Sequence, residues 1–274
     1  MIGTRTQRTC VVVDLETQEL ISGTPGVSRD LKVQRLQVSV ACALVLSSDD
    51  IMDSTLSAHE VIQRGRSIEA WRDRSPGAGG PFADLFACLD AAEVIVAYNG
   101  LDFDLPVLRK YIPPLENSER RYRSWTTKTH DPFMRLRATT GEWPSLDKML
   151  VANSLQSKTS SGVEAVKMWE EQRRDELLSY CKSDVDALAR LVLLPTSLVR
   201  TPRAMSVPAH LVSLRSALAS VRVCPTLEND AARMPPLKRA HNFSPEHDLL
   251  FIFEADRADK ADRADTPLRL AIAE

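Results

Sequence analysis

Residues Thr9 to Glu16 read Thr-Cys-Val-Val-Val-Asp-Leu-Glu, a short β-branched run that ends in two carboxylates. The three valines show no polar alternation, which favours a strand buried on both faces in a mixed sheet. Residues two apart along a strand share a face, so we expect Asp14 and Glu16 to point the same way. Two carboxylates side by side at the end of a buried strand repel each other unless a cation lies between them. Mg²⁺ and Mn²⁺ prefer such oxygen ligands, although a lone Asp-x-Glu is also common at the start of a solvated turn.

The composition, with 43% hydrophobic and 26% charged residues among 274, is that of a soluble globular protein. This length holds one large domain, or one domain with an appendage. The formal net charge of -2 excludes a uniformly basic nucleic-acid coat but not a local basic track. Five scattered cysteines without a Cys-x-x-Cys pair argue against a disulfide framework and a zinc site. Without an apolar run of membrane-spanning length or a signal peptide, we expect a soluble, intracellular protein that binds no membrane, in an unknown compartment.

The hydrophobic pattern predicts further elements along the chain. We expect a second strand at 33–46, a short third strand at 52–58 and the start of a helix at 67. Beyond these we expect a strand at 94–97 and helices at 82–92, 105–111, 145–151, 163–171 and 173–194. The pattern therefore predicts an α/β fold in which a β-meander begins a mixed sheet flanked by helices.

A polar connection at 113–137 carries basic residues interleaved with aromatic ones. The basic residues are Arg120, Arg121, Arg123, Lys128, Arg135 and Arg137, and the aromatic ones are Tyr122, Trp125 and Phe133. Positive charge together with stacking rings is what a groove for single-stranded nucleic acid uses. The other interpretation is a solvated loop whose rings pack back onto the domain, and the sequence favours neither. In the same segment, His130 and Asp131 suggest a pair of metal ligands, but a single histidine without a partner is more often structural or exposed.

The character of the sequence changes near residue 200. Seven of the sixteen prolines follow that point, and 255–265 repeats short Ala-Asp-Arg and Ala-Asp-Lys units. We therefore predict one domain at 1–200 and a Pro-rich, low-complexity, largely flexible tail at 201–274. Within this tail, 209–221 could form one amphipathic helix, and the tail as a whole could contact a protein partner.

Two further groups of polar residues accompany Asp14 and Glu16. The first reads Asn-Gly-Leu-Asp-Phe-Asp at 99–104, where the predicted strand turns into a helix. The second reads Tyr-Cys-Lys-Ser-Asp at 180–184 in the longest predicted helix, and its four-residue spacing puts Tyr180 and Asp184 on one face. Apolar residues pack nearby and imply that this face looks inward, so an ionised Asp184 needs a compensating charge.

The order Asp-x-Glu, Asn-x-x-x-Phe-Asp and Tyr-x-x-x-Asp resembles the three exonuclease motifs of the DEDD superfamily, and the tyrosine marks its DEDDy branch. The segment 145–188 looks similar to stand-alone exonuclease domains related to the proofreading domains of family B DNA polymerases. The resemblance covers roughly 9–195 and implies an RNase H-like mixed sheet flanked by helices. It also implies a metal-dependent 3′-to-5′ exonuclease that hydrolyses phosphodiester bonds at single-stranded DNA or RNA ends and releases nucleoside 5′-monophosphates, in DNA repair or RNA processing.

The resemblance also implies a role for each motif residue. The four carboxylates would hold two divalent cations, Mg²⁺ or Mn²⁺, roughly 3.5–4 Å apart; they are Asp14, Glu16, Asp104 and Asp184. Tyr180 would orient the attacking water by its hydroxyl, with the metals doing most of the acidification. Asn99 and Phe103 would position the terminal nucleotide by a hydrogen bond and by packing, although Asn99 with Gly100 is also a turn signal and Phe103 could be ordinary core.

Two other functions stay open on the sequence alone. One is a non-catalytic nucleic-acid or protein-binding module on the same fold, and the presence of all four acids and the tyrosine counts against it. The other is an assembly part that makes its contact through the tail, as an addition to catalysis. The choice between DNA and RNA is also open, because no residue can be assigned to the sugar 2′ position.

Overall fold

The computed structural model describes residues 8–223 except 22, 24, 74–79, 115–116, 157–161, 196–197 and 204. The part of the predicted tail beyond Val223, including the repeat at 255–265, lies outside them.

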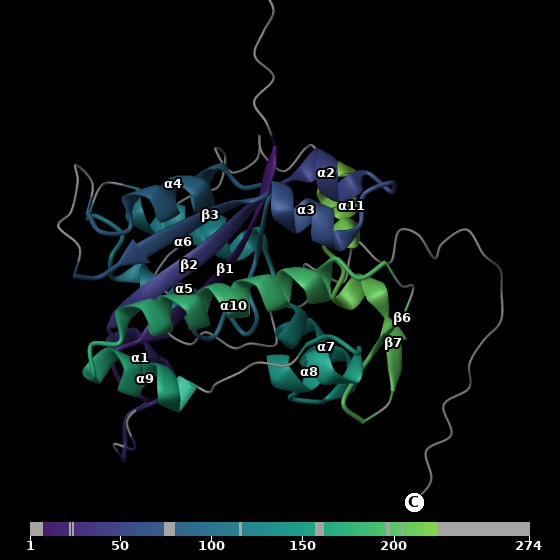
Figure 1. Cartoon of the computed structure of the whole chain (residues 1–274). Coiled ribbons are helices and arrows are strands. Elements are labelled where there is room, and N and C mark those ends of the chain that lie inside the picture. Colours follow the sequence, from purple (N-terminus) through teal and green to yellow (C-terminus); the bar gives the residue numbers. More distant parts are fainter. Residues whose placement is uncertain are drawn as a thin grey trace, which may run out of the picture. The chain divides into compact units, whose positions relative to one another are not determined.

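A mixed five-stranded sheet carries the fold, with the strand order β3-β2-β1-β4-β5. Its strands are β1 (Thr9–Thr17), β2 (Val38–Ser47), β3 (Arg66–Trp71), β4 (Val94–Val96) and β5 (Thr129–His130). Of these, β1, β2 and β3 are labelled in Figure 1. The first three strands form an antiparallel meander, whereas β4 runs parallel to β1 and β5 runs parallel to β4. The predicted α/β class with a mixed sheet is confirmed, and β1 lies at its centre as the uninterrupted apolar run predicts.

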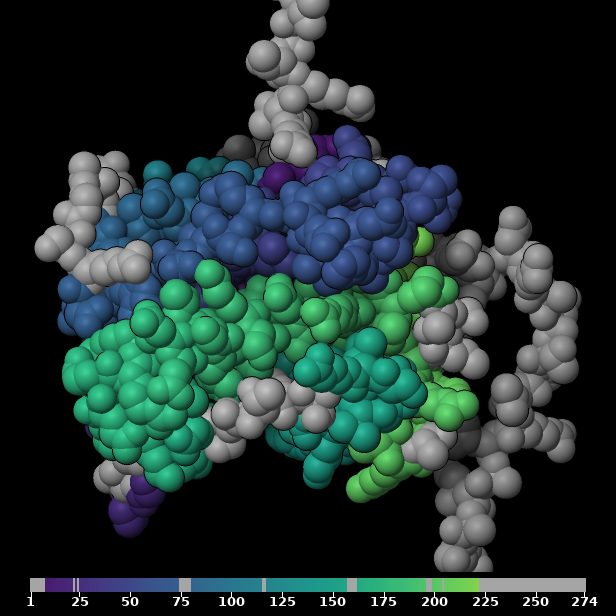
Figure 2. Space-filling model, viewed as in Figure 1, coloured from purple at the N-terminus to yellow at the C-terminus, as the bar shows by residue number. Residues whose placement is uncertain are grey.

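Helices build a core on each face of this sheet. One core includes side chains of α2 (Ser48–Met52), α3 (Ala58–Arg64), α7 (Pro132–Thr140), α8 (Leu146–Ala152), α9 (Gly162–Glu170), α10 (Arg174–Val192) and α11 (Leu214–Val223). The other includes side chains of α1 (Arg29–Arg35), α4 (Ala83–Ala91), α5 (Asp104–Arg109) and α6 (Ser118–Thr127). The long helix α10 crosses the sheet over β1 and β2 (Figure 1). On the surface, the green residues of α9 and α10 form a band beneath the blue residues near 50–70 (Figure 2).

Alternation along β1 divides its side chains between the two cores. Cys10 and Val12 belong to the core under α10, whereas Val11, Val13 and Leu15 belong to the opposite core. The even-numbered positions therefore face α10. By the same alternation, the two carboxylates that end the strand lie on the α10 side.

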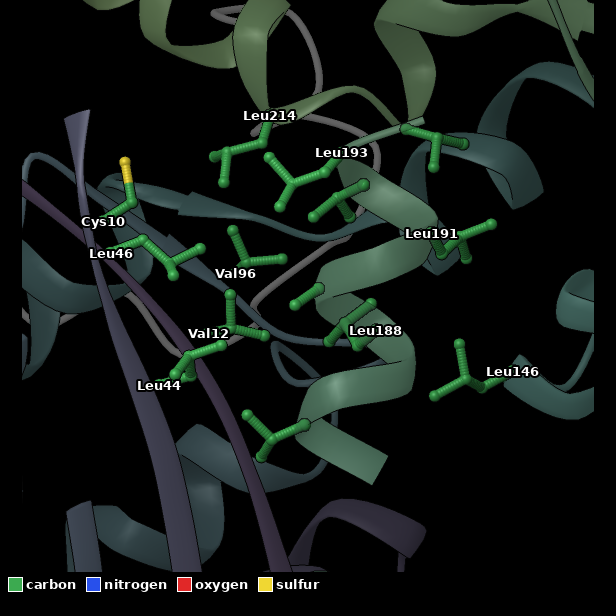
Figure 3. Close-up of a cluster of buried hydrophobic side chains, with 14 of the residues drawn as sticks. Cys10, Val12, Leu44, Leu46, Val96, Leu146, Leu188, Leu191, Leu193 and Leu214 are labelled. Carbon is green, nitrogen blue, oxygen red and sulfur yellow. The ribbon is translucent and has the colours of Figure 1, made fainter. Parts of the chain in front are cut away.

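The core beneath α10 joins three neighbouring strands to the helix. Val12 of β1, Leu44 of β2 and Val96 of β4 face Leu188 of α10 in the close-up (Figure 3). All four side chains are buried. Burying a side chain of this size stabilises the fold by about 1.5–3 kcal/mol, so the packing anchors α10 against the sheet.

The structure corrects the predictions made between residues 28 and 72. The stretch 33–46 is not one strand, because α1 occupies its first residues and β2 begins only at Val38. The predicted strand at 52–58 and the helix predicted to begin at 67 are also wrong, since α3 precedes β3 there. The physical reason is capping: Ser57 and Glu60 form a capping box that starts α3, and Ser28 caps α1.

The structure also corrects the polar connection predicted at 113–137. Most of it is regular, because α6, β5 and the first turns of α7 fall within it. Asp131 caps α7 through Met134 N at 3.2 Å, and Pro132 follows at the first helical position. The basic residues of this segment therefore lie largely on helices.

Regular elements continue past residue 200. The strands β6 (Leu198–Arg200) and β7 (Ser206–Pro208) pair antiparallel, and a 3₁₀ turn at Ala209–Leu211 precedes α11. Buried residues of this segment join the core under α10; they are Val199, Val207, Leu211, Val212, Leu214, Ala217 and Leu218. The helix expected at 209–221 is thus a 3₁₀ turn followed by a shorter α-helix. The domain boundary near 200 stays a prediction, and the segment that follows it is packed up to α11.

Among the described residues, every helix is too short or too polar to span a lipid bilayer.

Candidate active site

Three carboxylates meet where β1 ends beneath α10. One oxygen each of Asp14, Glu16 and Asp184 lies within 4.8 Å of the others. Asp184 is only 2% exposed, whereas Asp14 and Glu16 keep part of their surface in solvent. Like charges held this close repel one another, and a divalent cation with oxygen ligands relieves that repulsion. The donor set therefore fits a hard divalent metal.

Asp184 and Tyr180 stand one turn apart on α10, facing the end of β1. Leu177, Cys181 and Leu188 are buried along the same helix, and this apolar stripe turns the Tyr180–Asp184 face inward. Burial raises the pKa of the Tyr180 hydroxyl well above its usual range, and the carboxylates of Glu16, Asp184 and Asp14 add to the shift. The phenol is thus a neutral hydrogen-bond donor among carboxylates.

Asp104 approaches the same strand end from the other side of the sheet. It is the first residue of α5 and is 3% exposed. Its Oδ1 accepts a hydrogen bond from Leu15 N at 3.2 Å, and Leu15 lies between Asp14 and Glu16. Asp104 is not among the three residues whose carboxylate oxygens lie within 4.8 Å of one another, but this bond ties its carboxylate to the same end of β1.

The segment between β4 and α5 carries Asn99 and Phe103 in a tight turn that leads into Asp104. Asn99 has a left-handed backbone, with φ at 64°. A Cβ at Gly100 would lie 2.2 Å from Ala97 Cβ and 3.5 Å from Asp104 Oδ2, so only glycine fits there. Phe103 is half-buried and packs against the core that contains α5. Whether Asn99 and Phe103 touch a nucleotide stays a prediction.

Asp131 holds this turn in place. Its Oδ1 accepts a hydrogen bond from Asn99 N at 2.9 Å and its Oδ2 accepts one from Leu101 N at 3.1 Å, while Oδ1 also caps α7. The side chain is 1% exposed, and burial raises its pKa to about 6. The sequence alone suggested a pair of metal ligands at His130 and Asp131, or a histidine that is structural or exposed. An Asp directly before a proline is, however, a helix-start signal that points to the capping part of this role.

The other residues of the helix motif are structural. Cys181 is buried, and its thiol donates to the main-chain oxygen of Asp14 at 3.6 Å. Burial, with the neighbouring Cys42 thiol, raises the pKa of Cys181, so it is no thiolate nucleophile. Lys182 pairs with Glu69 of β3 and joins α10 to the sheet.

Several rings of the segment 113–137 pack back onto the domain. Trp125 is fully buried and its indole N–H donates to Asp90 Oδ1 at 2.7 Å, while Arg121 pairs with the same carboxylate. Phe133 is almost fully buried. The interpretation of the segment as a basic, ring-lined groove is therefore wrong for Trp125 and Phe133, which are core residues.

A family model of the RNase H superfamily matches residues 46–194, which is more than half of the chain. The chain therefore belongs to the RNase H superfamily, and the RNase H-like fold predicted from the motifs is confirmed. The match contains Asp104, Tyr180 and Asp184, and it begins after β1. No curated protein matches the chain.

Two solved structures illustrate what the fold is similar to. The family B DNA polymerase of the hyperthermophilic archaeon Pyrobaculum calidifontis is 17% identical, with a TM-score of 0.43, over 87% of this chain and 31% of the polymerase chain. Exonuclease I of E. coli, in complex with a 5cy-dT13 oligonucleotide, is 17% identical, with a TM-score of 0.33, over 64% of this chain and 42% of that chain. The chain thus spans less than half the length of either protein.

Proposed function

We propose that the protein is a metal-dependent 3′-to-5′ exonuclease that shortens single-stranded nucleic-acid ends and releases nucleoside 5′-monophosphates. The observation that carries the proposal is the meeting of Asp14, Glu16 and Asp184 within 4.8 Å, beside the neutral hydroxyl of Tyr180. Membership of the RNase H superfamily supports a nuclease. The three motifs in their order support degradation in the 3′-to-5′ direction.

The four carboxylates would hold two divalent cations, Mg²⁺ or Mn²⁺. Asp14 would be shared, Glu16 and Asp184 would complete one position, and Asp104 would serve the other. Bound ions of this kind supply an activated water and stabilise the attacking and leaving oxygens of an in-line displacement at phosphorus.

The remaining residues orient the substrate and the water. The Tyr180 hydroxyl, kept neutral by burial, would donate a hydrogen bond rather than accept a proton. Asn99 and Phe103 would hold the terminal nucleotide, on the turn that Asp131 fixes through two main-chain N–H groups. A preformed turn of this kind lowers the entropic cost of aligning the terminal phosphodiester with the carboxylates.

The proposal is tested by incubating 5′-labelled single-stranded and duplex DNA and single-stranded RNA with Mg²⁺, with Mn²⁺ and with a chelator. The test variant is Asp184→Asn, and its matched control is Asp186→Asn, which removes the same charge two residues further along α10. We expect a ladder that shortens from the 3′ end for the native and control proteins with metal only, and intact substrate for Asp184→Asn. Metal-independent cleavage, or equal cleavage by both variants, would contradict the proposal. No cleavage by the native protein, with strand binding intact, would favour the non-catalytic module.

A further inference from the structure

Trp143 is the most exposed of the large hydrophobic side chains in the described part of the chain, with 63% of its surface in solvent. It lies in the short connection between α7 and α8, after Gly141, which ends α7 in a left-handed conformation. An exposed indole adds little to a core. Trp143 therefore offers a large aromatic face to solvent.

Two side chains of α7 contact the indole of Trp143. The guanidinium carbon of Arg137 lies 3.6 Å from the centroid of the indole, which is a close stack. The ring of Phe133 meets the indole edge to face at 5.9 Å. We call Trp143, Arg137 and Phe133 the Trp143 platform. It is an exposed ring with a cation on it, backed by a core residue.

The Trp143 platform is joined to the turn that carries Asn99 and Asp104. Phe133 also contacts the ring of Tyr98 at 5.7 Å, and the Tyr98 hydroxyl donates to Pro144 O at 2.7 Å. Tyr98 directly precedes Asn99 in the chain. Arg137 Nη1 lies 3.6 Å from Asp102 Oδ2, two residues before Asp104. Three contacts thus link the Trp143 platform to the turn beside the candidate site.

We infer that the Trp143 platform binds the substrate strand upstream of the nucleotide being removed, with a base stacked on Trp143 and a phosphate paired with Arg137. This inference rests on the proposed function and extends it from the terminal nucleotide to the strand behind it. An aromatic face with an adjacent cation is the arrangement that binds single strands without sequence preference. A protein partner fits less well, because one ring and one cation are far smaller than a stable protein interface.

When Arg137 binds a phosphate of the strand, it gives up its contact with Asp102. In the free protein the guanidinium is near Asp102 at 3.6 Å and is about one third exposed, so a surface pair of little strength is given up. The phosphate gained in its place is an anion that a guanidinium binds well. Removal of an aromatic platform weakens strand binding by about 5- to 100-fold.

The test compares two substrates that differ in length. A single-stranded 12-mer, as DNA and as RNA, reaches beyond the terminal nucleotide, whereas the p-nitrophenyl ester of thymidine 5′-monophosphate does not. For Trp143→Ala we expect the ratio of kcat/KM for the 12-mer to that for the ester to fall about 5- to 100-fold. Trp143→Phe keeps an aromatic face and should recover most of the ratio, and Arg137→Ala should lower it.

Arg64→Ala is the matched control for Arg137→Ala. Arg64 also lies on a helix surface and is also 3.6 Å from one aspartate, Asp50, so the charge change is the same. If Trp143→Ala gives the same ratio as Arg64→Ala while the native protein is active, the inference fails and the proposed function stands. If the native protein hydrolyses neither substrate, the proposed function fails instead. Anisotropy of a labelled 12-mer then decides the inference, since equal binding by native protein and Trp143→Ala would overturn it and weaker binding by Trp143→Ala would support it.

Discussion

The main-chain N–H of Leu15 donates a hydrogen bond to Oδ1 of Asp104 at 3.2 Å, across 89 residues of sequence. Leu15 itself packs in the core opposite α10, so its N–H is held rigidly between Asp14 and Glu16. The bond fixes the first turn of α5 against the end of β1. It is the contact by which the fourth carboxylate of the proposed site is brought to the other three.

Two substitutions at Asp104 separate its charge from this hydrogen bond. Asp104→Asn keeps an oxygen that can accept from Leu15 N, whereas Asp104→Ala leaves that buried N–H unpaired and should destabilise the fold by about 1–3 kcal/mol. We expect both variants to lose turnover and only the alanine variant to lose this much stability in chemical denaturation. Native turnover in Asp104→Asn would remove Asp104 from the proposed metal site.

Tyr180→Phe should be milder than the loss of a carboxylate. The phenyl ring preserves the packing under α10 and removes only the hydroxyl that donates among Glu16, Asp184 and Asp14. Poorer alignment of the attacking water should lower kcat by up to roughly 100-fold and change KM little. Steady-state kinetics beside Asp184→Asn provides the measurement. An effect on kcat as large as that of Asp184→Asn would show that the hydroxyl does more than orient.

Gly100→Ala tests the geometry of the turn before α5. The added Cβ would lie 2.2 Å from Ala97 Cβ, so the turn must shift, at a cost of about 1–3 kcal/mol. Turnover should also fall, because a shift of the turn displaces Asp104, which follows four residues later. Gly23→Ala is the matched control, since a Cβ added at Gly23 would meet no atom within 4 Å. Thermal unfolding and turnover of the two variants should differ, and equal values would contradict the tight fit.

The buried histidine His130 should make the stability of the fold depend on pH. Its ring is fully buried with Nε2 2.9 Å from Val212 O, and burial lowers its pKa from 6.5 to about 3. The His130 ring therefore binds a proton less tightly in the folded protein than in the unfolded chain. The stability that the neutral ring contributes is complete above pH 6.5 and is lost as the pH falls toward 3.

The measurement is the free energy of unfolding at about pH 7.5 and about pH 5 for native protein, His130→Gln and, as a control, His59→Gln at an exposed histidine. We expect a smaller loss at the lower pH for His130→Gln than for the other two proteins. Asp131 acts in the opposite direction, because its pKa is raised from 3.8 to about 6, but it is present in all three and cancels. An equal loss in all three proteins would mean that His130 takes up no extra proton on unfolding.

Local periodicity was sufficient to predict the central features. The valine run of β1 predicted a strand buried on both faces, and alternation put Asp14 and Glu16 on one side of it. A spacing of four placed Tyr180 and Asp184 on one face of α10. These patterns involve neighbours in sequence, so they can be recognised without knowledge of the tertiary contacts.

The features that the sequence did not reveal depend on partners far away in the chain. Asp131 binds the turn at Asn99 from 32 residues away, and His130 meets Val212 across 82 residues. Trp143 looks like an ordinary aromatic residue in sequence, and only its exposure and the stacked Arg137 distinguish it. The strand predicted at 52–58 is wrong for a local reason, because a capping box of Ser57 and Glu60 starts α3 there.

In the proposed function, Asp14, Glu16, Asp104 and Asp184 form one metal site. The most direct measurement is anomalous diffraction from crystals of the protein soaked in Mn²⁺, with Asp14→Asn crystals as the comparison. We predict two manganese peaks bounded by these four carboxylates in the native protein and the loss of at least one in the variant. No peak at these carboxylates at a saturating Mn²⁺ concentration, or peaks held by other residues, would contradict it.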